Sequence, residues 1–264
     1  MKSTQVRAQA PAVTPERLTG LRRWNLGLTV LHAKAADYTL AKGRLGLISM
    51  AFSAAVLVAW TLLGGLDLLN TTLRDALLPN WGAMAYQLAL LAAFVVLGAL
   101  IELPFDWYAT FRVEQHHGFN RMTLRLWLTD MAKGAAVGAV IGLPLAALVL
   151  WIMGASGGLW WLWAWAAWVV FNLVLMVLYP TYIAPLFNKF EPLPDEALRQ
   201  RVQALMQRCG FAAKGLFVMD GSKRSAHSNA YFTGLGAAKR VVFFDTLLQR
   251  LSVPEVEAVL AHEL

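Results

Sequence analysis

The fold is decided by the stretch LWWLWAWAAWVVFNLVLMVL at residues 159–178, which contains no charged side chain. Residues 45–66, 83–101 and 134–153 lack charged side chains as well. About 20 apolar residues in a helix cross the hydrocarbon core of a bilayer, so each stretch is long enough to be a membrane span. Buried core helices of a soluble protein are the alternative, which the number and length of these stretches disfavour. We therefore predict a mainly α-helical membrane protein with four transmembrane helices.

The composition of the whole chain agrees with this prediction. Hydrophobic residues make up 58% of the chain and charged residues only 15%, whereas a soluble domain is roughly one quarter charged. Tryptophans gather around the short turn 154–158 between the last two predicted spans, where an aromatic belt would meet the bilayer surface. They are Trp151, Trp160, Trp161, Trp163, Trp165 and Trp168.

Lysine and arginine alternate between rich and poor segments along the chain. There are eight in residues 1–44, one in 67–82, four in 104–133, none in 154–158 and ten in 179–264. Because positively charged loops stay cytoplasmic, this predicts that both ends and the loop 104–133 face the cytoplasm. The net charge of +7 then reflects topology and contact with anionic lipid. A nucleic-acid partner is disfavoured, because the basic residues are not gathered on one soluble module.

Three domains follow: a basic cytoplasmic arm at 1–44, a transmembrane domain at 45–179 and a cytoplasmic tail at 180–264. In the tail, Asp195 can cap a helix that runs to about Cys209, with this cysteine on the apolar side of the helix as a small core residue. We also predict strands at Gly215–Met219, Ala226–Thr233 and Lys239–Phe244. A link through Gly234-Leu235-Gly236 is expected between the last two strands, and a short helix is expected to begin at Asp245.

The chain closes on Ala261-His262-Glu263-Leu264, and His-Glu is the first half of the metal-binding pattern H-E-x-x-H. A helix leads up to it: Ser252 and Glu255 predict a capping box, and Val256, Val259 and Leu260 then form an apolar stripe at helical spacing. His262 follows Val259 by three residues and is expected to point toward this stripe. The order of helix, strands and motif helix predicts a partial zincin-like α+β catalytic domain.

Several segments together resemble the integral-membrane zinc metalloproteases of the CAAX prenyl protease 1 type, here as a bacterial form. They occur in the family's order from about residue 34 to the end. The segments are Lys34-Ala35-Ala36-Asp37-Tyr38-Thr39, Leu103-Pro104-Phe105, Glu114-Gln115-His116-His117-Gly118-Phe119-Asn120, Ala184-Pro185-Leu186-Phe187-Asn188, Asp220-Gly221-Ser222-Lys223-Arg224-Ser225, His227-Ser228-Asn229-Ala230-Tyr231-Phe232, Phe244-Asp245-Thr246-Leu247-Leu248 and Ala258-Val259-Leu260-Ala261-His262-Glu263-Leu264.

The resemblance implies a zinc metalloendopeptidase of the bacterial inner membrane that cuts membrane-associated or C-terminal peptides. CAAX-type processing and membrane-protein quality control are the activities it suggests. His262 would be the first zinc ligand, and Glu263 the general base that takes a proton from the attacking water. The family's remaining ligands would follow Leu264, so we expect the chain to be truncated within the motif and inactive alone.

Asn229-Ala230-Tyr231 resembles the edge strand that holds a substrate in extended form, by pairing of backbone groups. We expect Asn229 to lie in the middle of its strand and to bond the substrate backbone. His227 is expected to have a structural role. Lys223 and Arg224 are expected to be solvated or at the lipid surface.

Two other readings remain open at this point. One is a non-enzymatic polytopic membrane module whose His-Glu pair is incidental, and the other is a degenerate relative that binds peptides without cutting them. Glu114, His116 and His117 could suggest a second metal site, but hydrogen bonding that orders their loop is the favoured interpretation. Glu102, at the edge of the second predicted span, would be costly if it faced lipid, so it is expected at the interface or turned toward a polar interior.

Overall fold

The computed structural model describes residues 15–210, 215–233 and 239–263, with side chains described from residue 32 to residue 262 within those ranges. The chain forms two compact units, residues 1–51 and 52–264. Most of the first unit that is described belongs to a single long helix, α1 (Pro15–Thr61), which ends in the second unit. The predicted link Gly234-Leu235-Gly236 lies outside the described residues.

Four helices are long and apolar enough to cross a membrane, within the part of the chain that the structure describes. The segments that qualify are His32–Thr61, Gly65–Glu114, Leu124–Ala155 and Gly157–Phe187. The prediction of a mainly helical protein with four membrane helices and a small α+β domain is confirmed. The helices are α2 (Gly65–Tyr108), the π-helical turn η1 (Ala109–Glu114), α3 (Leu124–Ala155), the short turn η2 (Gly157–Leu159), α4 (Trp160–Leu178), the π-helical turn η3 (Tyr179–Ile183) and α5 (Ala184–Phe187).

The loop expected at 67–82 is instead helical. It forms the first part of α2, and Gly82 (φ 78°, ψ 176°) breaks the helix just before the uncharged stretch that begins at residue 83. Only glycine adopts such a positive φ readily, so this residue sets the bend. The first predicted span also ends earlier than expected, because α1 stops at Thr61 and Gly64 (φ 81°) turns the chain into α2.

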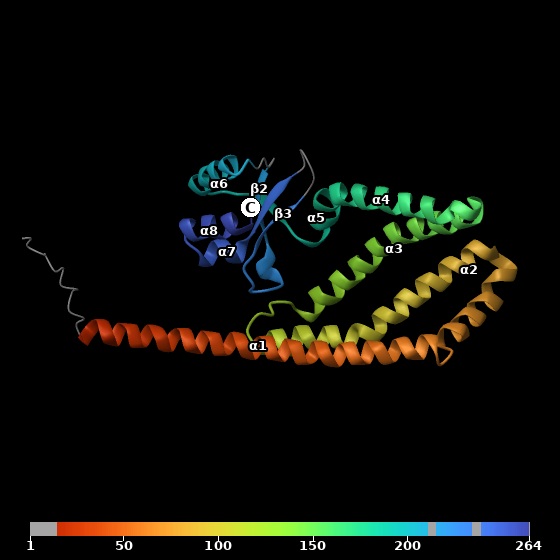
Figure 1. Ribbon diagram of the computed structural model, residues 1–264, viewed down its shortest axis with the longest axis horizontal. Helices are drawn as coiled ribbons and strands as arrows, with labels where there is room; N and C mark the ends of the chain where they lie inside the picture. Colours follow the sequence, from red (N-terminus) through yellow and green to blue (C-terminus); the bar gives the residue numbers. More distant parts are fainter. Residues whose placement is uncertain (1–14, 211–214, 234–238, 264) are drawn as a thin grey trace, which may run out of the picture. The chain divides into compact units, whose positions relative to one another are not determined.

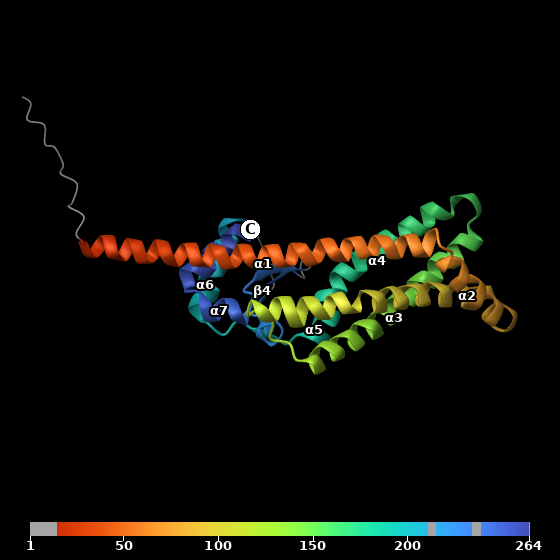
Figure 2. The same cartoon turned by 90° about the horizontal axis from the view of Figure 1, so that it is seen from below.

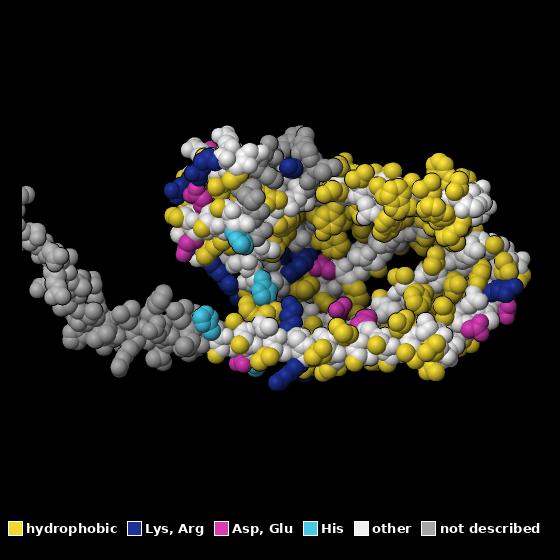
Figure 3. Space-filling view, in the orientation of Figure 1, with side chains coloured by type: hydrophobic (Ala, Val, Ile, Leu, Met, Phe, Trp, Pro, Cys, Tyr) yellow, Lys and Arg dark blue, Asp and Glu magenta, His cyan; other side chains and the backbone are white. Residues whose placement is uncertain are grey.

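Within the second unit, α3 packs against both α2 and α4 (Figures 1 and 2). Hydrophobic side chains are dense on the visible surface of α4 and spread over α2 and α3 (Figure 3), as expected for helices that face lipid. Glu102 of α2 is half-buried and accepts a 2.5 Å hydrogen bond from Ser53 Oγ. Its carboxylate therefore has a polar partner within the helices.

The tail folds around a mixed four-stranded sheet with the order β1-β2-β4-β3. β2 and β4 are parallel neighbours, whereas β1 and β3 run antiparallel to β2 and β4 respectively. Asp195 caps the helix α6 as predicted, with its carboxylate 3.0 Å from Leu198 N. The elements are β1 (Phe190–Pro192), α6 (Glu196–Arg208), β2 (Gly215–Met219), the turn η4 (Gly221–Lys223), β3 (Ala230–Thr233), β4 (Arg240–Phe244), α7 (Asp245–Arg250) and α8 (Val253–Glu263).

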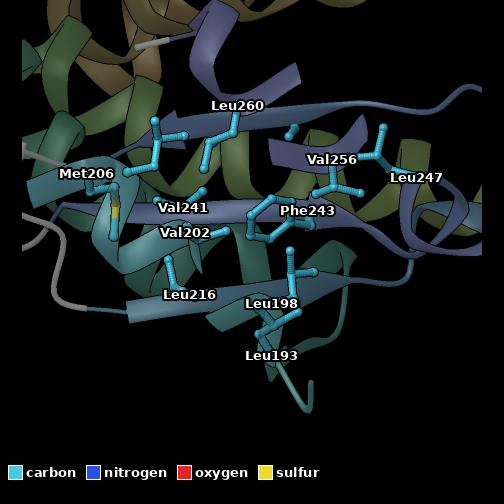
Figure 4. Close-up of a cluster of buried hydrophobic side chains, with 12 residues drawn as sticks. Leu193, Leu198, Val202, Met206, Leu216, Val241, Phe243, Leu247, Val256 and Leu260 are labelled. Atoms are coloured by element: carbon cyan, nitrogen blue, oxygen red, sulfur yellow. The ribbon is translucent and has the colours of Figure 1, made fainter. Parts of the chain in front are cut away.

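One face of the sheet meets α6, α7 and α8 and forms the core of the tail (Figure 4). Val241 and Phe243 of β4 are 0% exposed, as is Leu260 of α8. Alternate residues of β4 point to the opposite face, where Arg240 donates to Pro180 O at 3.2 Å. Cys209 is exposed at the end of α6, so its predicted core role is wrong: the helix stops one residue before it.

Candidate active site

The helix α8 begins at the predicted capping box. Glu255 Oε2 accepts hydrogen bonds from Ser252 N at 2.8 Å and from Ser252 Oγ at 2.7 Å, and Val256 N donates to Ser252 O at 3.0 Å. The hydrogen bonds from Ser252 lower the pKa of the Glu255 carboxyl. At pH values above the ordinary pKa of a carboxyl group, a lowered pKa in the folded protein stabilises the folded state. This stabilisation is lost as the pH falls through the lowered pKa.

The position of His262 differs from the prediction. Val256 and Leu260 are buried at 1% and 0% exposure, but Val259 is only half-buried and His262 is exposed. At about 100° per residue, position 262 lies on a different side of the helix from the buried residues Val256 and Leu260. The imidazole is therefore accessible from outside the core. Glu263 belongs to α8, but its side chain lies outside the described residues.

Beside α8 lies β3, which is at the edge of the sheet. Phe244 N donates to Asn229 O at 2.9 Å, and Ala230 stands opposite Phe243. In an antiparallel pair this makes Ala230–Phe243 a non-hydrogen-bonded pair. The pattern alternates along the strand, so the backbone N–H and C=O groups of Ala230 and Phe232 point away from β4. These groups are positioned to pair with an added strand.

Asn229 precedes β3 and is not in the middle of a strand, so this prediction is wrong. The chain from Ala226 to Asn229 makes other hydrogen bonds: Ala226 N donates to Phe119 O at 2.9 Å, and Thr246 Oγ1 donates to His227 O at 2.8 Å. The Asn229 side chain is exposed, and its Oδ1 accepts from Ala230 N at 2.9 Å. It therefore occupies the first outward-facing donor of the edge strand.

Ala230 and Tyr231 lie on opposite faces of the sheet. Ala230 is 1% exposed and belongs to the core. Tyr231 is half-buried on the other face, with its ring edge-to-face against Phe244 at a centroid distance of 6.2 Å. Burial raises the pKa of the Tyr231 phenol, and Tyr179 contributes less. The phenol is therefore protonated at neutral pH.

His227 has the structural contacts that the sequence suggested. Its ring stacks on Phe119 with a centroid distance of 4.1 Å and an interplanar angle of 15°. Its Nε2 lies 3.3 Å from Glu114 Oε2. His117 Nδ1 lies 2.8 Å from Val113 O. Glu114 and His117 thus take part in ordering the chain between α2 and α3.

The prediction for Arg224 is wrong: this side chain is partly buried and forms an ion pair with Asp130, so it is not solvated. Its Nε and Nη2 donate to the Asp130 carboxylate at 2.8 and 3.0 Å, its Nη1 donates to Asn188 Oδ1 at 2.6 Å, and its Nη2 also donates to Phe187 O at 2.6 Å. The side chains of Arg224 and Asp130 are 21% and 16% exposed. Lys223, in contrast, is exposed and pairs with Asp220 at 2.9 Å.

Sequence reasoning missed Asp130, which is the single acidic residue between Glu114 and Glu191. A single carboxylate near the start of a mostly apolar helix is a signal that could have prompted a search for a cation. It also missed Asp245, which accepts from Ser222 N at 2.8 Å and from Ser222 Oγ. This carboxylate fixes the turn after β2 to the start of α7.

The fit of a metal ion can be judged from His262. A neutral imidazole is a common zinc ligand, and this one is exposed and available. No group of three His, Cys, Asp or Glu side chains that could hold a metal lies within the part of the chain that the structure describes. The described side chains thus offer one suitable ligand and do not form a complete zinc site by themselves.

Membrane-spanning helices joined to an α+β domain, with a His-Glu helix beside an edge strand, define the class of integral-membrane metallopeptidases. The family model described as "CAAX prenyl protease N-terminal, five membrane helices" matches residues 29–189, and "Peptidase family M48" matches residues 192–264. The chain belongs to the CAAX prenyl protease 1 family of M48 peptidases.

Relatives and a solved structure agree with this assignment. The CAAX prenyl protease 1 homolog of Arabidopsis thaliana is 41% identical over 198 residues, which cover 73% of this chain and 47% of the relative. CAAX prenyl protease 1 of Saccharomyces cerevisiae is 36% identical over 241 residues, covering 88% and 53%. The crystal structure of S. mikatae Ste24p matches with a TM-score of 0.81 at 35% identity, covering 88% of this chain and 55% of that one. The chain spans about half the length of the curated relatives it matches.

Proposed function

We propose that this chain is part of a membrane-embedded zinc endopeptidase that hydrolyses peptide bonds of membrane-associated or C-terminal peptide substrates. The observation that carries the proposal is the arrangement of β3 and α8: an edge strand with outward backbone groups lies against the helix that bears His262. The preceding helices would keep this arrangement at a membrane. CAAX-type processing and membrane-protein quality control are the two uses that such a site would serve.

In this proposal His262 is one zinc ligand and Glu263 is the general base. Bound zinc would supply Lewis acidity, which lowers the pKa of a coordinated water to near 7. Glu263 would take the proton from the attacking water and pass it to the leaving amine. The two residues are neighbours on α8, so a carboxylate would be close to any metal held by the imidazole.

The substrate would pair with β3 as an additional strand. Ala230 would provide backbone groups, because its N–H and C=O point away from β4. Asn229 Oδ1 would release Ala230 N when the substrate arrives, which frees the amide to bond the substrate backbone. Tyr231 would support the strand from the opposite face of the sheet.

The distribution of basic residues supports an orientation with the N-terminus and the tail in the cytoplasm. A multi-pass membrane protein follows from the family and from the four candidate spans. We propose the bacterial inner membrane as its location. Reporter fusions placed after residues 44, 80 and 156 in a bacterial host would test the orientation, with a cytoplasmic signal expected only for the first.

The test of the function uses the purified full-length protein in liposomes, with zinc measured by elemental analysis and cleavage followed by mass spectrometry. About one zinc per chain is expected, with hydrolysis of a membrane-anchored peptide that stops after chelation and returns when zinc is restored. Absence of zinc and of cleavage would contradict the proposal and favour a non-enzymatic membrane module. Zinc or peptide binding without cleavage would favour the degenerate relative.

Replacing Asn229 with alanine is expected to lower kcat/KM for peptide cleavage by about tenfold, with zinc content unchanged, because one hydrogen bond to the substrate backbone is lost. Asn229→Asp is the matched variant: it keeps an oxygen that can accept from Ala230 N but loses the amide donor. Equal losses in both variants support donation to the substrate. Wild-type kinetics in Asn229→Ala would return this residue to a structural role.

Strand pairing predicts a periodic response to substrate methylation. N-methylation removes one backbone donor at a time, and only alternate residues of an added antiparallel strand face β3. Cleavage rates for a series of singly N-methylated peptides should therefore fall at every second position near the scissile bond. A smooth dependence on distance from that bond would contradict pairing with β3.

A further inference from the structure

Three separate segments of the chain meet at Arg224. Its guanidinium donates to the Asp130 carboxylate near the start of α3, to Phe187 O at the end of α5 and to Asn188 Oδ1 just after α5. Lys133, one turn after Asp130, donates to Leu186 O of α5 at 2.8 Å. Arg224 itself belongs to the loop between β2 and β3. The Arg224 side chain therefore links α3 and α5 to the loop that precedes β3.

The backbone around Arg224 is also attached to the membrane region. Asn120 and Ser225 form an antiparallel bridge, and Arg121 N donates to Arg224 O at 3.1 Å. These bonds do not depend on the guanidinium, so the loop should keep its course when the side chain is changed. The guanidinium adds what the backbone cannot: a planar fork that fixes direction as well as distance.

The same loop leads directly into the edge strand. Between Arg224 and Ala230, His227 O accepts from Thr246 Oγ1, and Ser228 Oγ donates to Thr246 O at 3.2 Å. One end of the loop is thus fixed to the membrane helices and the other to the sheet. Any rotation of the sheet relative to α3 would have to break the contacts of Arg224.

We propose that Arg224, through Asp130 and Asn188, is a positioning residue that sets the place of β3 relative to the membrane helices. This inference rests on the proposed function, because the consequence of positioning β3 is the alignment of a membrane-anchored substrate with the cleavage site. A substrate held in the bilayer reaches β3 at a fixed depth and direction. We call the contacts of Arg224 with Asp130 and Asn188 the Arg224 clamp. A free peptide can follow small movements of the sheet, so its cleavage does not need the clamp.

The clamp is tested first without any activity measurement. Cys209 is the single cysteine and is exposed on the sheet domain, and Val140 is exposed on α3 at 74%. Spin labels on Cys209 and on Val140→Cys report the distance between the two parts by pulsed electron resonance. We expect a narrow distribution in the parent and a broader one in Arg224→Gln and Asp130→Asn. The control, Lys223→Gln, should stay narrow, because the ion pair of Lys223 is with Asp220 of its own turn. Unchanged widths in both clamp variants would overturn the proposal whether or not the protein cleaves peptides.

The consequence for cleavage is measured in liposomes with one cleavage sequence presented in two forms, membrane-anchored and free. In Arg224→Gln and Asp130→Asn, kcat/KM for the anchored form should fall by about tenfold or more, since small misplacements are costly. The value for the free form should stay within about twofold, and the double variant should be no worse than either single one. Arg224→Lys should rescue only part of the loss, because an ammonium lacks the fork.

Equal losses for the two substrate forms would contradict a positioning role. If Arg224→Gln does not fold, Asp130→Asn and Asn188→Ala carry the same test, since each removes one partner of the guanidinium and leaves the arginine in place. If the unsubstituted protein cleaves neither form, the proposed function alone is contradicted. The distances between the spin labels would still test the positioning role of Arg224.

Discussion

Glu263→Gln in the full-length protein is expected to lose peptide hydrolysis by several orders of magnitude while zinc stays bound. The amide has nearly the same shape as the carboxylate but cannot take a proton, so the general base is removed and His262 is left unchanged. Single-turnover cleavage of a membrane-anchored peptide and elemental analysis of the same preparation are the measurements. Peptide binding should persist, because β3 is intact.

Two comparisons make this result interpretable. His262→Ala should lose zinc as well as activity, since one metal ligand is removed. Glu257→Gln is the matched control on the same helix: Glu257 pairs with Arg201 and Arg208 of α6 at 3.7 and 3.5 Å and has no part in the proposed chemistry. Substantial turnover in Glu263→Gln would remove this residue from the mechanism.

Phe243→Ala is expected to destabilise the sheet domain by about 3–5 kcal/mol, the usual cost of deleting a fully buried phenylalanine. Phe243 is 0% exposed on the central strand and contacts the cluster formed by α6, α7 and α8. Limited proteolysis of the tail at increasing denaturant concentration measures the effect without unfolding the membrane helices.

Phe217→Ala is the control for this prediction. Phe217 lies in β2 of the same sheet but is only half-buried, and its ring faces the Arg240 guanidinium at 5.3 Å. Its loss should cost roughly half as much or less, because less apolar area leaves the core. Equal costs at the two positions would mean that the face with α6, α7 and α8 is not the main core.

Much of the fold could be predicted from the sequence, because its strongest signals are local. Uncharged stretches, the cap at Asp195 and the capping box at Ser252 and Glu255 each depend on residues within a few turns. The order of helix and strands in the tail follows from similar patterns. The register of β3 and its place at the sheet edge could not be read from the residues alone, since both depend on pairing with a strand that follows later in the chain.

The errors arose where distant residues decide the structure. Asn229 was expected inside a strand, but the residues before it bond to Phe119 and Thr246 instead. Arg224 looked like one of two adjacent surface cations, yet its partner is 94 residues away. The segment 67–82 was expected as a loop because it carries charged residues between two uncharged stretches, but it is helical up to the bend at Gly82.

The strand order also determines when the tail can fold during synthesis. β4 is a central strand but follows the other three described strands of the sheet along the chain, so β2 gains its parallel neighbour only after residues 240–244 have left the ribosome. The membrane helices precede it and are made first. Until β4 arrives, the apolar residues of α6 and β2 lack Val241 and Phe243, the fully buried partners in their cluster, next to helices already in the bilayer. The nascent tail is therefore most exposed to aggregation and proteolysis at this stage, and the arrival of β4 connects β2 to β3.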